Sequence, residues 1–291
     1  MDKVIKFAIV GGDKRQAQLA AMLARDGHRV RVCCMEKAGE IDGAEAVSMA
    51  KAIEDADCIL LPLPALNNAG DINTPLSAKE VTVEQFLRSM PMHTPVYGGR
   101  LGTSFLESAG KLGLQAEDYF LREELKIANA AATAEGAIQI AMEETDITLC
   151  SARVLVIGYG RIGRLLSAKL KALGASVTAS ARKPADLAWI KAEGLTTVST
   201  SALEPVLAKQ DIIFNTVPAT VMDSRRLSLV KKGCVCIDLA SKPGGTDFEA
   251  AAQLGVKVIW ALSLPGEVAP ISSGAAIRDT VYNLLRERGV L

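Results

Sequence analysis

Residues 153–163 read Arg-Val-Leu-Val-Ile-Gly-Tyr-Gly-Arg-Ile-Gly, and this stretch decides the fold class. The apolar run before Gly158 predicts a buried strand, and the three glycines predict a tight turn into a helix. Leucines at three- and four-residue spacing follow, then Gly174 and a second apolar run. The order strand, glycine turn, helix, strand predicts a dinucleotide-binding unit, with an ordinary glycine-rich turn as the alternative.

In such a unit, the glycine turn and the first free N–H groups of the helix bind the pyrophosphate of the cofactor. The residues expected to do so are Gly158, Tyr159, Gly160, Arg161, Ile162 and Gly163.

The end of the second predicted strand indicates which dinucleotide binds. An NAD site usually carries an acidic residue about 20 residues into the unit, which binds the ribose 2′-hydroxyl. No Asp or Glu occurs between Gly163 and Asp186, where Ser180, Arg182 and Lys183 stand instead. A hydroxyl, a guanidinium and an ammonium group suit a 2′-phosphate. NADP is therefore favoured over NAD, and the alternative is a solvated basic turn with NAD bound loosely.

Composition excludes several classes of protein. The 291 residues suffice for two domains, and Lys plus Arg equal Asp plus Glu at 33 each, which gives no sign of a nucleic-acid or membrane partner. No apolar run approaches 18 residues and no secretory leader is evident, so we expect a cytoplasmic protein. Six cysteines show no C-x-x-C spacing, and His28 and His93 are the two histidines, so no metal site is expected.

The first half of the chain repeats the plan of the second. Residues 7–12 predict a strand running into glycines, 16–24 a helix and 29–33 the next strand. Two α/β domains, Rossmann-like and with parallel sheets, follow from this alternation. Val10 and Arg15 occupy the places of the first and third glycines, so a second dinucleotide site is not expected. Arg15 is instead a candidate for binding a substrate carboxylate, with a surface arginine as the alternative.

Two long helices are predicted to join the domains. Residues 121–145 contain few helix breakers, and residues 273–288 have an apolar face. We therefore expect a flavodoxin- or Rossmann-like substrate domain at 1–125, completed by a terminal helix at 273–291. The cofactor domain, with the linking helix, is expected at 126–272. The helices would form a hinge and leave a cleft between the domains.

Loops that follow the strands of parallel sheets are the expected ligand-binding segments. Thr216, Val217 and Pro218 follow the fourth strand of the cofactor domain, Asp238 the fifth, and Ser263, Leu264 and Pro265 the sixth. We assign these to the cofactor, with the last three at the nicotinamide carboxamide. The basic residues Arg15, Arg100 and Lys242 are expected in the cleft, where they would bind a small dicarboxylate. For Lys242, a position in water is the alternative.

Several of these motifs together resemble the A-subunit of bacterial dipicolinate synthase. The motifs are 9–16, Leu63-Pro64, 133–138, the glycine turn, 238–245 and 262–266. The glycine turn alone would also fit D-2-hydroxyacid dehydrogenases, adenosylhomocysteinase and alanine dehydrogenase.

The resemblance implies a formate/glycerate-dehydrogenase-like fold that oxidises dihydrodipicolinate to dipicolinate with NADP. It places the protein in the mother cell of a sporulating bacterium, beside a flavoprotein-like B-subunit. Two alternatives stay open: a cofactor-binding protein that is inactive without the B-subunit, and an NAD(P)-dependent hydroxyacid or amino-acid dehydrogenase. A homo-oligomer is also open. Since no His–carboxylate pair is evident, we expect the substrate to be oriented mainly by Arg15 with Arg100 or Lys242.

Overall fold

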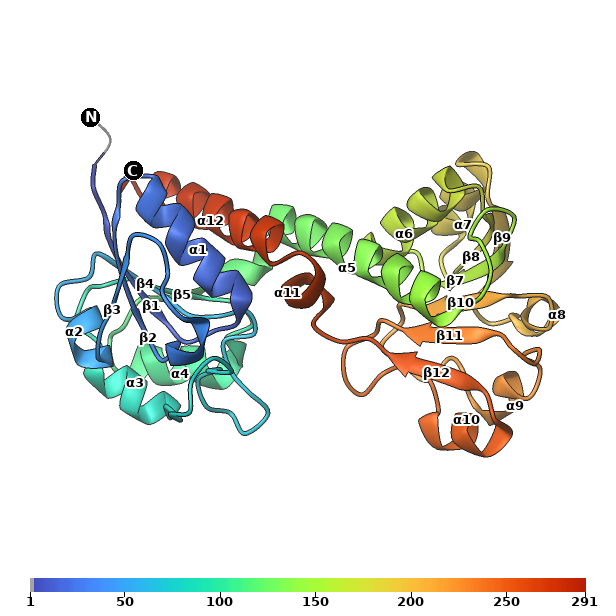
Figure 1. The fold of residues 1–291 in the computed structure, drawn as a ribbon, viewed down its shortest axis with the longest axis horizontal. Coiled ribbons are helices and arrows are strands. Elements are labelled where there is room, and N and C mark those ends of the chain that lie inside the picture. The colour runs from blue at the N-terminus through green and yellow to red at the C-terminus, as the bar shows by residue number, and fades with distance from the viewer. Residues whose placement is uncertain (1–2) are drawn as a thin grey trace. The chain divides into compact units, whose positions relative to one another are not determined.

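The computed structural model describes residues 3–291 and divides the chain into two compact units (Figure 1). The first unit runs to Asn129 and includes Ala269–Leu291, and the second is Ala130–Val268.

The first unit contains a six-stranded parallel sheet in the order β3-β2-β1-β4-β5-β6. Its strands are β1 (Lys6–Val10), β2 (Arg29–Cys33), β3 (Ala44–Ala46), β4 (Cys58–Leu60), β5 (Val96–Gly98) and β6 (Ala116–Asp118). Its helices are α1 (Lys14–Arg25), α2 (Met49–Ile53), α3 (Val83–Ser89), α4 (Gly102–Lys111) and α12 (Pro270–Glu287), with 3₁₀ turns at Glu36–Ala38 and Tyr119–Leu121.

The second unit contains a six-stranded parallel sheet in the order β12-β11-β10-β7-β8-β9. Its strands are β7 (Arg153–Ile157), β8 (Ser176–Ala181), β9 (Thr196–Ser199), β10 (Ile212–Asn215), β11 (Val235–Asp238) and β12 (Lys257–Trp260). Its helices are α6 (Arg161–Ala172), α7 (Pro184–Ala192), α8 (Glu204–Leu207), α9 (Ser224–Leu227), α10 (Phe248–Leu254) and α11 (Leu264–Val268). Helix α5 (Glu123–Glu144) crosses the boundary between the units.

Both sheets have the strand order 3-2-1-4-5-6 of the Rossmann fold when numbered within their own unit. The predicted class, two Rossmann-like domains with parallel sheets, is therefore confirmed. In each unit the strand order reverses beside the first strand, which is where such folds bind ligands beyond the carboxyl ends of the strands.

Each sheet is covered by helices on both faces, which explains the continuous apolar runs of its central strands. In the first unit, α1 and α12 cover one face while α2, α3 and α4 cover the other (Figure 1). In the second unit, α5, α6 and α7 pack on one face, and α8, α9 and α10 on the other.

In both units an aspartate joins the amino-terminal ends of the two central strands of the sheet. Asp57 precedes β4 and accepts a hydrogen bond from the Lys6 amide at 2.9 Å. Asp211 precedes β10 and accepts one from the Arg153 amide at 2.7 Å. In both cases a residue before the fourth strand binds the first residue of the first strand, so the similarity of the two halves extends to a specific contact.

Small residues let the long helices approach their neighbours closely. A Cβ on Gly136 of α5 would lie 3.1–3.2 Å from side-chain atoms of Val268 and Leu264, at the ends of α11. A Cβ on Gly274 of α12 would lie 2.9 Å from the Arg15 carbonyl oxygen of α1. The close contact of Gly274 with α1 explains why the terminal helix completes the first unit.

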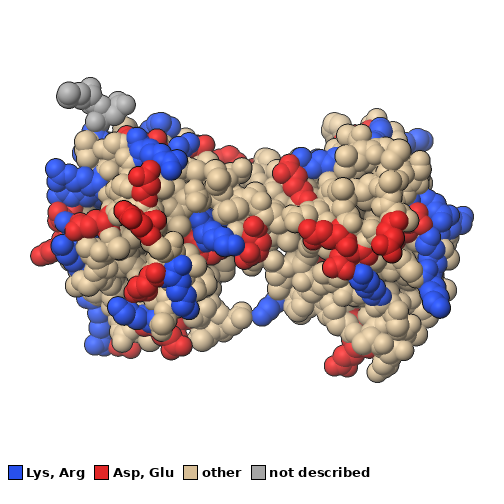
Figure 2. All heavy atoms as spheres, in the orientation of Figure 1, with Lys and Arg blue, Asp and Glu red and all other residues tan. Residues whose placement is uncertain are grey.

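Acidic and basic side chains are interspersed over much of the face drawn in Figure 2. Among residues 3–291 there is no helix with the length and apolar character needed to cross a membrane.

Candidate dinucleotide and substrate sites

The glycine turn between β7 and α6 is closely packed at two of its three glycines. Gly158 has a φ of +97°, and a Cβ there would overlap the Thr216 hydroxyl. A Cβ on Gly163 would overlap the Gly158 carbonyl oxygen. These two positions require glycine for the geometry of the turn and for the close approach of α6 to β7.

Gly160, between them, has the opposite environment. A Cβ on Gly160 would have no described heavy atom within 4 Å, and the residue is exposed. It is the N-cap of α6 and provides no capping side chain, so its neighbours' amide groups are available at the helix N-terminus. An open face at the second glycine is what a pyrophosphate lying against the backbone needs, so the turn fits a dinucleotide.

Tyr159 is anchored inside the unit by its side chain. Its hydroxyl donates to Glu193 at 2.5 Å, and the Arg164 guanidinium lies 5.2 Å from the centre of its ring. Burial and the hydrogen bond to Glu193 raise the pKa of the Tyr159 hydroxyl. Arg164 in turn binds Asp186 at 3.0 Å. The side chain thus holds the glycine turn against α7.

Ser180 makes two contacts within the protein. It is fully buried at the end of β8, and its hydroxyl lies 3.3 Å from the Gly158 amide and 3.1 Å from the Thr200 hydroxyl. Both contacts are within the protein, so Ser180 braces the glycine turn, and its assignment to the 2′-phosphate stays a prediction.

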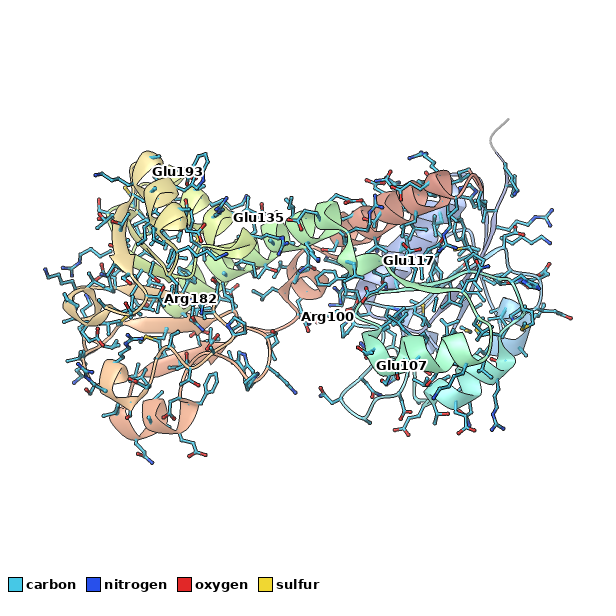
Figure 3. All side chains as sticks on the ribbon, turned by 180° about the vertical axis from the view of Figure 1, so that it is seen from behind. Arg100, Glu107, Glu117, Glu135, Arg182 and Glu193 are labelled. Carbon is cyan, nitrogen blue, oxygen red and sulfur yellow. The ribbon has the colours of Figure 1, made fainter. Side chains whose placement is uncertain are left out.

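Arg182 and Lys183 follow β8 directly and are exposed. Neither side chain has a hydrogen bond or ion pair with any other residue in the described part of the chain. Arg182 and Glu193 flank opposite ends of α7 (Figure 3). The two basic groups are therefore available at the carboxyl end of the strand where a 2′-phosphate would bind.

Thr216, Val217 and Pro218 lie at the carboxyl end of β10, beside the glycine turn. The Thr216 hydroxyl donates to the Ile157 carbonyl oxygen at 2.9 Å, which fixes the segment against β7. Thr216 and Val217 are half-buried and Pro218 is exposed. This placement beside Gly158 leaves their assignment to the cofactor as a prediction.

Asp238 holds its own loop, and its assignment to the cofactor stays a prediction. It is buried, and its carboxylate accepts hydrogen bonds from Asn215 at 3.0 Å and from the Ala240 amide at 2.9 Å. The second oxygen accepts from the Gly245 amide and the Thr246 hydroxyl, both at 2.8 Å. These four bonds occupy the carboxylate and shape the segment that carries the exposed Lys242.

Ser263, Leu264 and Pro265 do not form the open loop that the sequence suggested. Leu264 and Pro265 are buried and begin the short helix α11, which packs on Gly136 of α5. Ser263 alone of the three is exposed, with a φ of +59°. Ser263 is therefore the member of this segment whose side chain is exposed, and the assignment of all three residues to the cofactor stays a prediction.

Arg15 is committed to the protein interior. Its side chain is 5% exposed, and it binds both carboxylate oxygens of Asp13, the shortest contact being 2.7 Å. A further hydrogen bond goes to the Leu63 carbonyl oxygen. Arg15 thus joins α1 to the segment after β4, and since its guanidinium is buried and already paired, it offers fewer free donors to a substrate carboxylate than an exposed arginine does. Its role as a substrate receptor stays a prediction.

Arg100 is held differently. Asp118 accepts hydrogen bonds from the amides of Arg100 and Leu101, at 2.9 and 3.1 Å, and this fixes the backbone after β5. The Arg100 guanidinium lies 5.6 Å from the centre of the Phe120 ring, and the residue is exposed (Figure 3). A fixed backbone and an exposed guanidinium make Arg100 the better candidate for a substrate carboxylate in this unit.

The segment after β4 covers the glycine turn of the first unit, which the sequence did not indicate. The Gly12 amide donates to the Asn73 carbonyl oxygen at 2.9 Å, and a Cβ on Gly11 would lie 2.8 Å from Thr74. The chain itself thus packs against the turn at Gly11 and Gly12. The cluster Asn67-Asn68-Ala69-Gly70-Asp71 indicates a loop, but nothing in it indicates where the loop folds.

Two family models match successive parts of the chain. Residues 6–120 match the family model of the dipicolinate synthase A-subunit N-terminal domain, and residues 123–242 match the NAD-binding domain of D-isomer-specific 2-hydroxyacid dehydrogenases. Together these matches support an oxidoreductase that uses a nicotinamide cofactor.

Similar proteins cover nearly the whole chain. The dipicolinate synthase A-subunit of Bacillus subtilis (strain 168) is 32% identical over 97% of this chain and 96% of its own. The crystal structure of the dipicolinate synthase A-subunit from Bacillus halodurans superposes with a TM-score of 0.86 at 32% identity, covering 97% of this chain and 99% of that chain. A transhydrogenase from Sinorhizobium meliloti shares the fold, with a TM-score of 0.73 at 18% identity over 97% and 94% of the two chains.

The nucleotide-type glycine turn, the paired Rossmann sheets and this extent of similarity lead to one assignment. The chain belongs to the dipicolinate synthase A-subunit family.

Proposed function

We propose that the protein oxidises dihydrodipicolinate to dipicolinate with NADP, in the mother cell of a sporulating bacterium. The observation that carries this proposal is a turn built for a dinucleotide, with an open Gly160, in a chain 32% identical over nearly its full length to a dipicolinate synthase A-subunit. Because those relatives are designated A-subunits, the proposed partner is a second, flavoprotein-like B-subunit of dipicolinate synthase.

NADP is the proposed cofactor because of the charge that follows β8. Arg182 and Lys183 are exposed there, and no acidic residue lies between Gly163 and Asp186 to bind a ribose 2′-hydroxyl. Asp186 itself binds Arg164 at 3.0 Å. A guanidinium binds a phosphate through two parallel hydrogen bonds, so Arg182 is the proposed main determinant, with Lys183 adding charge.

The proposed substrate carries two carboxylates, and each unit offers an exposed basic residue at the carboxyl ends of its strands. Arg100 is the candidate in the first unit and Lys242 the candidate in the second. Orientation of the ring by its carboxylates would contribute to catalysis, because it would hold the reacting carbon in one geometry.

When bound, NADP supplies a two-electron acceptor that takes a hydride from the substrate. Loss of one further proton completes the aromatic ring, and aromatisation lowers the barrier to that loss. Histidine is not placed for this step: the His28 ring packs edge-on against Phe7 and Tyr282, and His93 lies in the loop before β5. The hydroxyacid dehydrogenase alternative, which calls for such a base, is therefore less well supported.

The cofactor proposal is tested by equilibrium binding of NADP and NAD to the full chain and to Arg182→Asp. We expect NADP affinity to fall by about a hundredfold, because a charge-assisted pair is replaced by repulsion, and NAD affinity to change by less than about threefold. The matched control is Arg225→Asp, an exposed arginine of α9 in the same unit, which should change neither. Equal losses for both nucleotides in Arg182→Asp would remove the 2′-phosphate assignment.

A further inference from the structure

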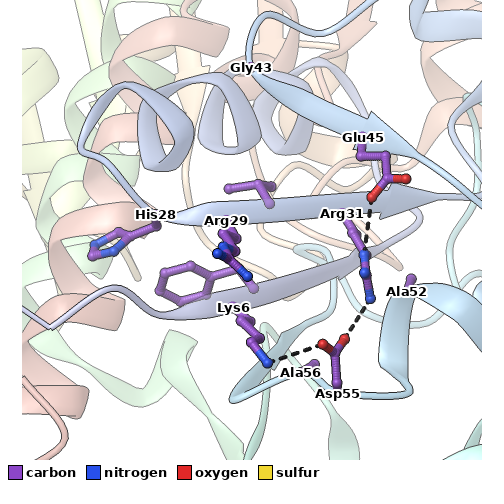
Figure 4. Close-up of a pocket in the computed structure, with 11 residues that line it drawn as sticks. Lys6, His28, Arg29, Arg31, Gly43, Glu45, Ala52, Asp55 and Ala56 are labelled. Carbon is purple, nitrogen blue, oxygen red and sulfur yellow. Dashed lines mark hydrogen bonds and ion pairs between the residues drawn. The ribbon is translucent and has the colours of Figure 1, made fainter.

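A cavity lies at the amino-terminal ends of the strands in the sheet of the first unit. It has a volume of about 400 Å³ and opens where β1 and β2 begin (Figure 4). Its charged and aromatic lining residues are Lys6, Phe7, His28, Arg29, Arg31, Glu45 and Asp55. Lys6 and Arg29 are the first residues of β1 and β2, so the cavity lies at the amino ends of strands whose carboxyl ends carry the glycine turn.

Three basic side chains come from one face of two neighbouring strands. Lys6 is paired with Arg29 in the parallel register of β1 and β2. Side chains alternate along a strand, so Arg31 projects from the same face as Arg29. Like charges directly opposite each other on a sheet are destabilising unless an anion compensates them.

Two of the three basic groups are compensated within the protein. Asp55 accepts from Lys6 at 3.1 Å and from Arg31 at 2.5 Å, and Glu45 accepts from Arg31 at 3.2 Å (Figure 4). The hydrogen bond from Lys6 and the charge of Arg31 lower the pKa of Asp55, so its carboxylate stays ionised at neutral pH.

Arg29 differs from its neighbours. It is exposed, and over residues 3–291 its guanidinium has neither an ion pair nor a hydrogen bond. Three cations therefore line the cavity against two carboxylates, and the uncompensated one carries a planar set of donors.

We propose that this cavity binds a small molecule with an oxyanion group, either a phosphate or a carboxylate, held by Arg29. The guanidinium matches both groups through paired hydrogen bonds, and Lys6 adds a second positive charge opposite it. The volume is in the range of small-molecule sites, and Phe7 and Ala52 provide apolar wall for the rest of the ligand. The site is separate from the glycine turn of the second unit and does not depend on the proposed reaction.

The test is calorimetric titration of the full chain, without nucleotide, with inorganic phosphate and separately with pyridine-2,6-dicarboxylate. We expect saturable binding of at least one probe, weakened at least about tenfold in Arg29→Gln and less in Arg29→Lys, which keeps the charge but loses the paired donors. Arg25→Gln is the matched control, since Arg25 is exposed in the same unit and pairs with Asp42 at 3.3 Å. It should bind as the wild type does.

The two probes distinguish a phosphate ligand from a carboxylate ligand. Binding of either probe that depends on Arg29 supports the proposal, and the probe that binds shows whether the ligand group is a phosphate or a carboxylate. The proposal is overturned if neither probe binds saturably, or if Arg29→Gln binds as tightly as the wild type. Circular dichroism melts of each variant check folding, and because no turnover is measured, the result stands apart from that of the proposed oxidation.

Discussion

Substitution of Gly160 and Gly163 by alanine should separate cofactor binding from stability. A Cβ at Gly160 meets open space, and the residue has a φ of −80°, which alanine adopts readily. Gly160→Ala should therefore fold with unchanged or slightly higher stability, by up to about 1 kcal/mol. The same methyl group would stand where a pyrophosphate approaches the backbone, so NADP affinity should fall at least about tenfold, the loss of one charge-assisted hydrogen bond.

Gly163→Ala should act in the opposite way. Its Cβ would lie well inside 3.0 Å of the Gly158 carbonyl oxygen, and backbone cannot rotate aside as a side chain can. Displacing α6 from β7 should cost about 3 kcal/mol and lower the melting temperature by about 10 °C.

Thermal melts followed by fluorescence, with NADP titration of both variants below their transitions, measure the two effects. The reasoning is refuted if Gly160→Ala binds NADP as the wild type does, or if Gly163→Ala melts at the wild-type temperature.

Three further predictions follow from side chains whose partners the structure identifies. Arg15→Ala leaves Asp13 without its bidentate partner and should lower the free energy of unfolding by about 3 kcal/mol. Arg100→Ala should instead raise the substrate KM at unchanged stability. Chemical denaturation and kinetics of both variants measure these effects, and the prediction is contradicted if the two variants show each other's effects. Burial would raise the pKa of Asp211, but Lys231 and Arg153 lower it to about 2, so its contribution of about 2 kcal/mol should be present above pH 4 and be lost as pH falls toward 2. Asp211→Asn should flatten this part of the stability profile, and a profile identical to that of the wild type would rule this out. Asp238→Asn should destabilise the loop that carries Lys242 and thereby raise the substrate KM more than the Kd of NADP. An equal change in both constants would instead support a direct contact of Asp238 with the cofactor.

The sequence predicted the parts of the fold that depend on local pattern. The glycine turn at 158–163, the helix near 121–145 and the terminal helix all appear in the structure, because apolar periodicity and glycine placement act over a few residues. The sequence does not indicate that Gly136, within the motif at 133–138, packs on α11.

What the sequence did not indicate is that several polar residues predicted as ligands have partners in distant parts of the chain. Asp238 is bound by Asn215, 23 residues away, and Ser180 by Thr200, 20 residues away. Arg15 is similar, since the Leu63 carbonyl lies 48 residues from it. Hydrogen-bond partners of this separation are set by tertiary structure, so the sequence pattern does not indicate them. Arg182 and Lys183 are exposed and remain the candidates for the 2′-phosphate.

The central claim is most directly tested by incubating the purified chain alone with freshly generated dihydrodipicolinate and NADP, and measuring dipicolinate and NADPH together. The account predicts that the two products appear in equal amounts. It is contradicted if NADP binds but neither product forms until the B-subunit is added, because the chain would then be the cofactor-binding part of a shared enzyme.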